Sequence, residues 1–283
     1  MSNKNESGKI GDTGHLWDGN LRELTNNPPR WWMLSFWASI AWVVIYFILY
    51  PAIPMVTSYT KGIMGWTQIN EYKEDLSSIE EIRAPFESRI QSMTPAEILA
   101  DRELTQYTVR SAKVLFGDRC APCHGAGGAG NPGYPVLADD DWLYGGTVET
   151  IQTTITNGRQ GVMPGFGASL NAQQIDDLTQ HVLAMSQGSE HAPGKELFMS
   201  AGCIACHGLD GKGIQAMGSA NLTDAIWRFA PGSAESIKHT IIHGVNAGTA
   251  DSRSAVMPSF AKQLSAAEIT KLAVYVHQLG GGQ

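Results

Sequence analysis

The sequence is poor in cysteine and has no cluster of basic residues. Only four of the 283 residues are cysteines. The 20 lysines and arginines are outnumbered by 27 aspartates and glutamates, and no stretch of the chain concentrates them. Because nucleic-acid binding relies on a basic patch, this composition excludes it as the function.

The acidic excess is placed unevenly along the chain. Residues 1–50 contain four basic and four acidic side chains, so the whole net charge of −7 lies beyond residue 50. An acidic outer domain favours encounter with a cationic partner. The same charge also suits a surface that only keeps the protein soluble, and the sequence leaves both interpretations open.

Long hydrophobic runs are absent apart from one. Residues 31–50 are free of charge, and as a helix they would span about 30 Å, the hydrocarbon thickness of a bilayer. Trp31 and Trp32 at one end, and Tyr46 and Tyr50 towards the other, suit the two membrane interfaces. Thirty residues precede the run and no small-residue cleavage site follows it, which argues against a signal peptide. We expect a membrane anchor.

Residues 51–106 form a polar connection beyond the anchor. Pro51, Pro54 and Lys61 interrupt its beginning, so no second span is expected. Thr94, Pro95 and Glu97 combine an N-cap, a proline at the first helical position and a capping-box glutamate, which predicts a helix start. Both a helical stalk and an ordinary solvated linker fit the remainder.

All four cysteines lie in two C-x-x-C-H runs, the attachment pattern of a c-type haem. The runs are Cys120, Cys123 and His124, and Cys203, Cys206 and His207. Two thiols three positions apart can bond to the two vinyl groups of one porphyrin, and the adjoining imidazole then reaches the iron. The sequence therefore predicts two covalently bound haem c groups.

Zinc and structural disulfides are the alternatives that the cysteine count permits. Two thiol pairs with adjacent histidines could supply a zinc site. Zinc ribbons and fingers, however, rarely place histidine directly after C-x-x-C and then separate the pairs by some eighty residues, as here. Haem is the favoured interpretation.

The chain beyond residue 106 repeats itself. Trp142 in the first copy corresponds to Trp227 in the second, and each is followed by a short helix-like stretch. A Met-Pro pair comes next in each copy, and then a capped helix that begins near Asn171 or Ser265 and carries one apolar face. Two copies of one small helical haem domain explain this pattern.

The repeat also supplies a candidate second ligand for each iron. Met163 and Met257 stand at equivalent places, each followed by a proline that stiffens the loop. A thioether raises the potential of a haem relative to a second histidine. Met217, His239 and His243 have no counterparts in the first copy and are interpreted as surface or core residues. Pairing within each repeat is favoured by spacing, but two packed domains could exchange methionines.

The proximal imidazoles should each donate their second N–H to a backbone carbonyl. Pro135 is the expected carrier in the first copy, and Ala220 stands there in the second. Since c-type haem is attached outside the bacterial cytoplasmic membrane, the N-terminus is expected in the cytoplasm and residues 51–283 in the periplasm.

The chain resembles the dihaem subunit III, of CcoP/FixP type, of cbb3-type cytochrome c oxidases. The resemblance rests on the tandem motifs together with the anchor and the stretch before it, from His15 to Gly19 and from Glu23 to Trp32. It implies a non-catalytic relay of electrons from a donor cytochrome c, across two haems, to the monohaem subunit. The electrons would then reach the catalytic haem–copper subunit, which reduces oxygen. On this interpretation His124, Met163, His207 and Met257 are the axial ligands.

Two other functions fit the haem motifs. An anchored dihaem cytochrome could serve a different respiratory complex, and only the N-terminal stretch disfavours it. A dihaem peroxidase would require one iron with an open face, which two symmetrical Met-Pro loops argue against.

The predicted fold is mainly α, with one transmembrane helix followed by two tandem cytochrome c-like domains. The predicted division is a cytoplasmic segment 1–30, the span 31–50, a periplasmic stalk or linker 51–106, and haem domains 107–187 and 188–283.

Overall fold

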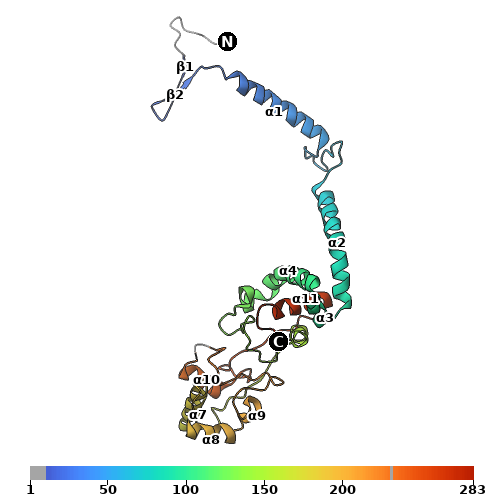
Figure 1. Cartoon of the computed structure of the whole chain (residues 1–283). Helices are drawn as coiled ribbons and strands as arrows, with labels where there is room; N and C mark the ends of the chain where they lie inside the picture. The colour runs from blue at the N-terminus through green and yellow to red at the C-terminus, as the bar shows by residue number, and fades with distance from the viewer. Residues whose placement is uncertain (1–10, 230–231) are drawn as a thin grey trace. The chain divides into compact units, whose positions relative to one another are not determined.

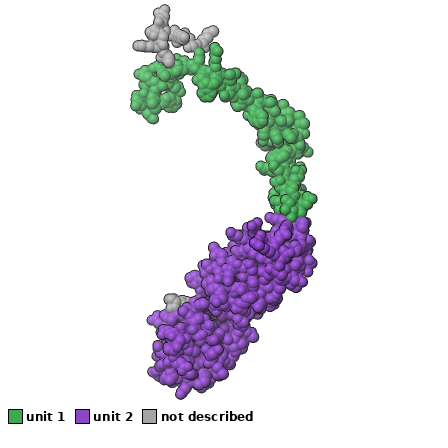
Figure 2. All heavy atoms as spheres, viewed as in Figure 1, with its two compact units in different colours: residues 1–82 green, residues 83–283 purple. Residues whose placement is uncertain are grey.

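The computed structural model describes residues 11–229 and 232–283, and it confirms a mainly α-helical chain. The chain divides into two compact units, residues 1–82 and 83–283, which are coloured separately in Figure 2. The first unit contains the apolar helix, and the second contains both C-x-x-C-H runs.

A two-stranded hairpin lies at the start of the described chain. Strands β1 (Asp12–Trp17) and β2 (Leu21–Leu24) pair antiparallel. Asp18 and Gly19 join them with φ angles of 48° and 79°, and Asn20 donates its N–H to the Trp17 carbonyl. Two central residues with positive φ define a type I′ turn, for which Asp-Gly is a preferred pair. This hairpin was not among the elements predicted from the sequence. Residues 1–10 of the expected cytoplasmic segment lie outside the described part.

Helix α1 (Arg30–Leu49) corresponds to the expected anchor. It is 20 residues long, none of them is buried, and among the described residues it alone is long and apolar enough to cross a membrane. The following loop folds back on its end, where Ile63 and Met64 donate N–H groups to the carbonyls of Ile48 and Leu49 at 2.9 and 3.1 Å. These bonds satisfy carbonyls that a helix end leaves without partners.

Helix α2 (Gln68–Ser92) shows that the polar connection is helical from residue 68 on, after the loop at 51–67. Its last turns belong to the second unit, where Ile90 is 1% exposed. Ile98 and Leu104, also from the range assigned to a linker, are fully buried in the same core. The folded body therefore includes residues well before 107, because apolar side chains at these positions complete its core.

The second unit contains ten short helices within the described residues. In chain order they are α3 (Pro95–Ala100), α4 (Arg102–Arg119), α5 (Ala121–His124), the 3-10 turn η1 (Ala126–Gly128), α6 (Val148–Asn157), α7 (Ala172–Met185), α8 (Ala192–Ser200), α9 (Ile204–His207), α10 (Ala234–His243) and α11 (Ala266–His277).

The helix starts follow local sequence signals. Capping boxes open α3 at Thr94, α7 at Asn171 and α11 at Ser265, as the sequence predicts. In each box the side chain of the N-cap residue accepts from the backbone N–H three positions later, and the side chain at that position accepts from the N-cap N–H. Local chemistry alone therefore sets these boundaries.

The second unit has two hydrophobic cores at its two ends. The first core is built by the last turns of α2 together with α3, α4, α6 and α11. Leu104 and Leu272 are fully buried in it, and Phe116 is 1% exposed. The second core is built by α7, α8 and α10 around Leu178, Phe198 and Ile237. Figure 1 shows α3, α4 and α11 grouped together and α7, α8 and α10 grouped apart from them.

Each core combines helices from both sequence repeats. The last helix of the second repeat, α11, packs on α4 and α6 of the first. In turn α7, the last helix of the first repeat, packs on α8 and α10 of the second. The side chain of Gln152 donates to Thr270 Oγ1 at 2.9 Å across this exchange. The sequence repeats and the folded halves therefore divide the chain differently.

Candidate functional site

The first C-x-x-C-H run lies at the end of α4, against the first core. Cys120 ends α4 and packs on this core, and the one-turn helix α5 carries Cys123 and His124. His124 is 9% exposed, and its Nδ1–H donates to the carbonyl of Pro135 at 3.1 Å. The ring is thereby fixed with Nε2 left to bind a metal.

The second run repeats this geometry at the second core. Cys203 packs on the second core, and α9 carries Cys206 and His207. The Nδ1–H of His207 donates to the carbonyl of Ala220 at 2.9 Å. Both expected carbonyl partners are thus confirmed, and the two imidazoles are held in the same manner.

Burial sets the protonation of both histidines and of the more enclosed thiols. Burial lowers the pKa of both His124 and His207, although the hydrogen bonds to their carbonyl partners act in the opposite direction. The positive charge of Arg228 lowers the pKa of His124 further. Burial, with a smaller contribution from Cys123, raises the pKa of Cys120 to about 11. The imidazoles are therefore neutral near pH 7, which is the form that binds a metal.

These donors fit haem better than zinc. All four cysteines are described and none forms a disulfide, so four thiols are free to form thioether bonds. Within residues 11–229 and 232–283, no three histidine, cysteine or acidic side chains converge in a way that could hold a metal ion. Each motif instead offers two thiols and one oriented imidazole, the set that a covalently attached porphyrin uses.

Each Met-Pro loop lies against the opposite repeat. Met257, from the second repeat, packs on the first core together with Cys120, and its backbone pairs with that of Arg159 just after α6. Met163, from the first repeat, pairs with Val245 just after α10. Phe166, in the same loop, packs on the second core. Each methionine therefore lies with the folded half that holds the other repeat's attachment motif.

Two glycines permit these close backbone approaches. Gly158 follows α6 with φ +72°, and a Cβ there would lie 2.4 Å from the carbonyl oxygen of Met257. Gly244 follows α10 with φ +74°, and a Cβ there would lie 2.3 Å from the carbonyl oxygen of Met163. Neither distance leaves room for a side chain, so glycine is needed twice at equivalent places.

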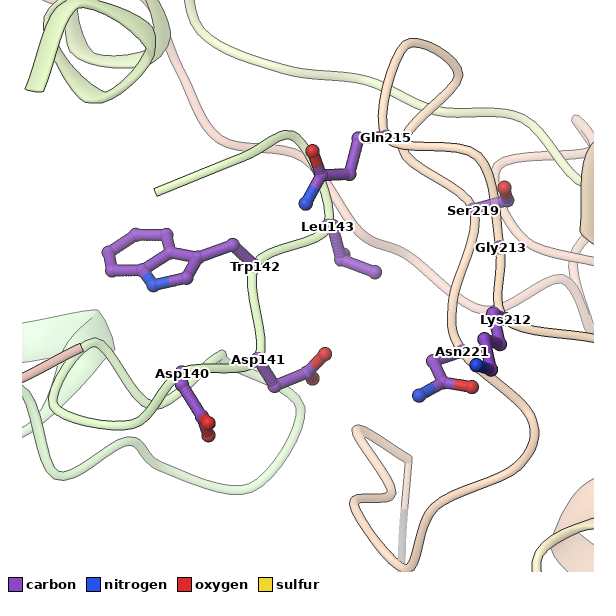
Figure 3. Close-up of a pocket in the computed structure, with 9 residues that line it drawn as sticks. All are labelled: Asp140, Asp141, Trp142, Leu143, Lys212, Gly213, Gln215, Ser219 and Asn221. Carbon is purple, nitrogen blue, oxygen red and sulfur yellow. The ribbon is translucent and has the colours of Figure 1, made fainter. Parts of the chain in front are cut away.

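A polar cavity lies between one loop of each repeat. It has a volume of about 170 Å³ and lies between residues 140–143 of the first repeat and residues 212–221 of the second. Figure 3 shows Asp141 and Leu143 on one side, with Lys212 and Asn221 on the other. Burial raises the pKa of Asp141, and the nearby carboxylate of Asp224 adds to this effect.

Arg228 is the charged residue near the first motif that no sequence pattern indicated. It comes from the second repeat, directly after Trp227, yet its charge acts on His124 and on the carboxyls of Asp139 and Asp141. Burial lowers the pKa of Arg228, and the two carboxylates oppose this shift. A pattern of spacing within one repeat could not find it, since the residues it faces belong to the other.

The remaining candidate donors lie elsewhere. The rings of His239 and His243 lie next to each other along α10, with centroids 4.6 Å apart and planes tilted by 44°. Met217 is 53% exposed. Trp142 packs on the first core and Trp227 on the second, consistent with their equivalent places in the repeat.

Three family models match consecutive parts of the chain. The N-terminal domain of cytochrome oxidase-cbb3, FixP, matches residues 10–57. Cytochrome C oxidase, cbb3-type, subunit III, matches residues 108–182, and Cytochrome c matches residues 191–280. The two cytochrome c domains imply two haem c groups, one for each attachment motif.

Curated relatives match over almost the full length. The cbb3-type cytochrome c oxidase subunit FixP of Azorhizobium caulinodans is 42% identical over 96% of this chain and 93% of its own. Subunit FixP of Bradyrhizobium diazoefficiens is 39% identical over 98% of this chain and 97% of its own. Subunit CcoP of Cereibacter sphaeroides is 38% identical over 99% of this chain and 98% of its own. With identity of this level extending from the apolar helix through both haem motifs, the chain belongs to the FixP/CcoP family, the membrane-anchored dihaem electron-transfer subunits of cbb3-type cytochrome c oxidases.

Proposed function

We propose that this subunit relays electrons from a donor cytochrome c, over its two haems, to the monohaem and catalytic haem–copper subunits of the oxidase. The observation that carries the proposal is the pair of matching sites within one compact unit. In each site two free thiols would hold the porphyrin, and a histidine fixed by a backbone carbonyl would supply a ligand to its iron. When bound, each haem supplies an iron that takes up and releases one electron.

The axial methionines are assigned across the repeats. Met257 shares the first core with Cys120, which supports it as the partner of His124. Met163 pairs with Val245 beside α10, which supports it as the partner of His207. Both methionine loops are held by backbone hydrogen bonds of 2.9 to 3.0 Å, so the main chain that carries each thioether is kept in a defined place.

His/Met ligation fits a relay better than a peroxidase. With a histidine and a methionine as ligands, both faces of each iron would be occupied, whereas peroxide chemistry needs one open face. A thioether also raises the potential relative to a second imidazole, which suits electron delivery to an oxygen-reducing partner. The Met-Pro loops thus favour electron transfer without catalysis in this subunit.

The haem domains are assigned to the periplasmic side of a bacterial inner membrane. Helix α1 supplies one span, and the attachment of c-type haem takes place outside the cytoplasmic membrane. Residues 1–29 would then lie in the cytoplasm. Membership of the family supports the oxidase as the complex in which the subunit is anchored.

Purification from membranes in a mild detergent tests the proposal. The oxidase relay predicts that haem b and copper co-purify with the two haems c of this subunit. A dihaem cytochrome that serves another complex would come without them. A protein that reacts with peroxide and shows one five-coordinate haem would be a peroxidase.

A further inference from the structure

Helix α2 carries a row of exposed apolar side chains along one face. Ile69, Tyr72, Leu76 and Ile79 are 66%, 61%, 36% and 42% exposed, respectively. Their spacing of three, four and three residues is the a/d pattern of a coiled-coil seam. We call these four residues the α2 seam.

Beyond Arg83, which interrupts the apolar pattern at one a position, the same heptad reaches a part of the helix that is already packed. Phe86 and Ile90 occupy the following d and a positions. Ile90 is 1% exposed in the first core, and the ring of Phe86 stacks on Tyr107 with centroids 4.5 Å apart. The apolar stripe is therefore a packing surface in its last turns, whereas its first turns are exposed to solvent.

The charges beside the seam argue against the bilayer as its partner. Residues 68–82 contain five acidic side chains and one basic one, Lys73; the acidic residues are Glu71, Glu74, Asp75, Glu80 and Glu81. Helices that lie on membranes carry lysine and arginine on their polar face, because membrane surfaces are anionic. Asp75 and Glu80 lie directly beside the seam together with Lys73, and the other three acidic residues lie on the rest of the helix surface. This excess of acidic over basic charge complements a basic protein surface.

The charges also argue against a second copy of this chain. Two copies anchored in one bilayer would bring their α2 helices together in parallel. In a parallel pair, side chains at the g position face those at the following e position of the partner helix. Asp75 of one copy would then face Glu80 of the other, and like charges repel.

We propose that the α2 seam binds an amphipathic helix with basic flanks from another subunit of the oxidase complex. The proposal rests on the membership of that complex. It assigns to α2 a role in assembly that is separate from the electron path, because the seam residues lie on α2 outside both hydrophobic cores that hold the haem motifs.

Site-specific photo-crosslinking in the intact membrane tests which chain covers the seam. A benzophenone amino acid at Leu76 is expected to link the subunit to another oxidase subunit, and the same group at Ser77, on the opposite face, is not. Crosslinks to a second copy, crosslinks to lipid alone, or equal crosslinking from Leu76 and Ser77 would each overturn the proposal.

Charge substitution in the full-length protein gives an independent test. The double variant Leu76→Glu, Ile79→Glu is expected to retain about a tenth or less of the co-purified oxidase subunits per haem c, since tenfold corresponds to about 1.4 kcal/mol. The matched control Ser77→Glu, Ser78→Glu adds the same charge on the other face and should leave that ratio unchanged. Equal recovery of the partner subunits in both double variants would contradict the proposal.

Haem content and co-purification together distinguish failure of the seam proposal from failure of the proposed function. The seam variant is expected to keep two haems c per chain and both potentials, because its substitutions lie outside the two cores. If the unmodified chain co-purified with no oxidase subunit, the proposed function would fail. If it did co-purify and the seam variant also kept the complex, only the seam proposal would fail.

Discussion

Met257 and Arg159 exchange two backbone hydrogen bonds, each 2.9 Å long, although they belong to different repeats. Met163 and Val245 form the equivalent pair at 3.0 and 2.9 Å. Each methionine loop is thereby joined to the helix that ends beside it in the opposite repeat. On the proposed ligation, the two haem sites are interdependent, and neither repeat contains all the parts of one site.

Replacing each methionine by histidine should lower one haem potential. We expect Met257→His to lower one potential and Met163→His to lower the other, each on the order of 0.1 V, within the range of about 0.8 V that axial ligands span. Oxygen consumption by the complex should slow in both. A redox titration followed by absorbance measures the shifts. If Met257→His kept both potentials, Met257 would not be a ligand.

Gly244→Ala should displace the Met163 loop. The residue has φ +74°, and the added Cβ would lie 2.3 Å from the Met163 carbonyl oxygen. We expect loss of the weak absorption band of methionine–iron coordination for one haem, together with a strain of about 1–3 kcal/mol from the backbone.

Gly188→Ala is the matched control for that variant. Its φ of +70° carries a similar backbone strain, but a Cβ there meets no atom within 4 Å. It should lose stability and keep both methionine bands. Equal spectra for the two alanine variants would show that crowding at Gly244 does not position Met163.

A core substitution in one sequence repeat should perturb the haem that is attached to the other repeat. Leu272 is fully buried in α11, in the second repeat, but belongs to the first core. We expect Leu272→Ala to cost about 2–5 kcal/mol and to perturb the haem attached at Cys120. Leu178→Ala in α7 should perturb the haem attached at Cys203, since Leu178 lies in the second core. Proton NMR of the haem methyl groups distinguishes the two haems, and the reverse pattern would contradict the exchanged arrangement.

The ion pair that joins α2 to α11 should make stability depend on pH. Glu87 accepts hydrogen bonds from Lys271 Nζ at 2.5 Å and from the Tyr107 hydroxyl at 2.6 Å. Burial alone would raise the pKa of Glu87, but these two bonds outweigh it and hold that pKa below its usual value. The pair therefore stabilises the fold fully above the unfolded pKa of about 4.5, and the stabilisation is lost as pH falls through the lowered folded pKa.

Thermal unfolding at several pH values measures that contribution. Glu87→Gln should have a lower Tm than the unmodified chain at pH 7. The difference between the two Tm values should shrink as pH falls below about 4.5. Glu103→Gln, which neutralises an exposed carboxylate on the neighbouring α4, should leave Tm almost unchanged. A Tm difference for Glu87→Gln that did not shrink in acid would show that the pair does not act through its charge.

The structural features that could be predicted from the sequence are those set by residues only a few positions apart. The capping boxes at Thr94, Asn171 and Ser265 set helix starts through bonds between residues three positions apart. The proximal histidines were predictable because C-x-x-C-H fixes their chemistry within one turn. The hairpin at Asp18 and Gly19 was equally local, and its Asp-Gly turn signal could have revealed it.

The exchange of helices between repeats was beyond such reasoning. The apolar face of α11 would suit either α4 or α8, since both repeats present similar partners, and only the packing of the whole unit selects α4. The same holds for Arg228, whose neighbours Asp139 and Asp141 come from the other repeat. Equivalent helices of the two repeats are nearly interchangeable as packing partners. A local sequence pattern therefore does not say which of them will pack together.

The most direct test is a crystal structure of the haem-loaded protein. The exchanged arrangement predicts that the sulfur of Met257 binds the iron whose porphyrin is attached at Cys120 and Cys123 and whose other ligand is His124. The sulfur of Met163 should bind the iron opposite His207. If Met163 instead shared an iron with His124, each repeat would complete its own site and the exchanged arrangement would be contradicted.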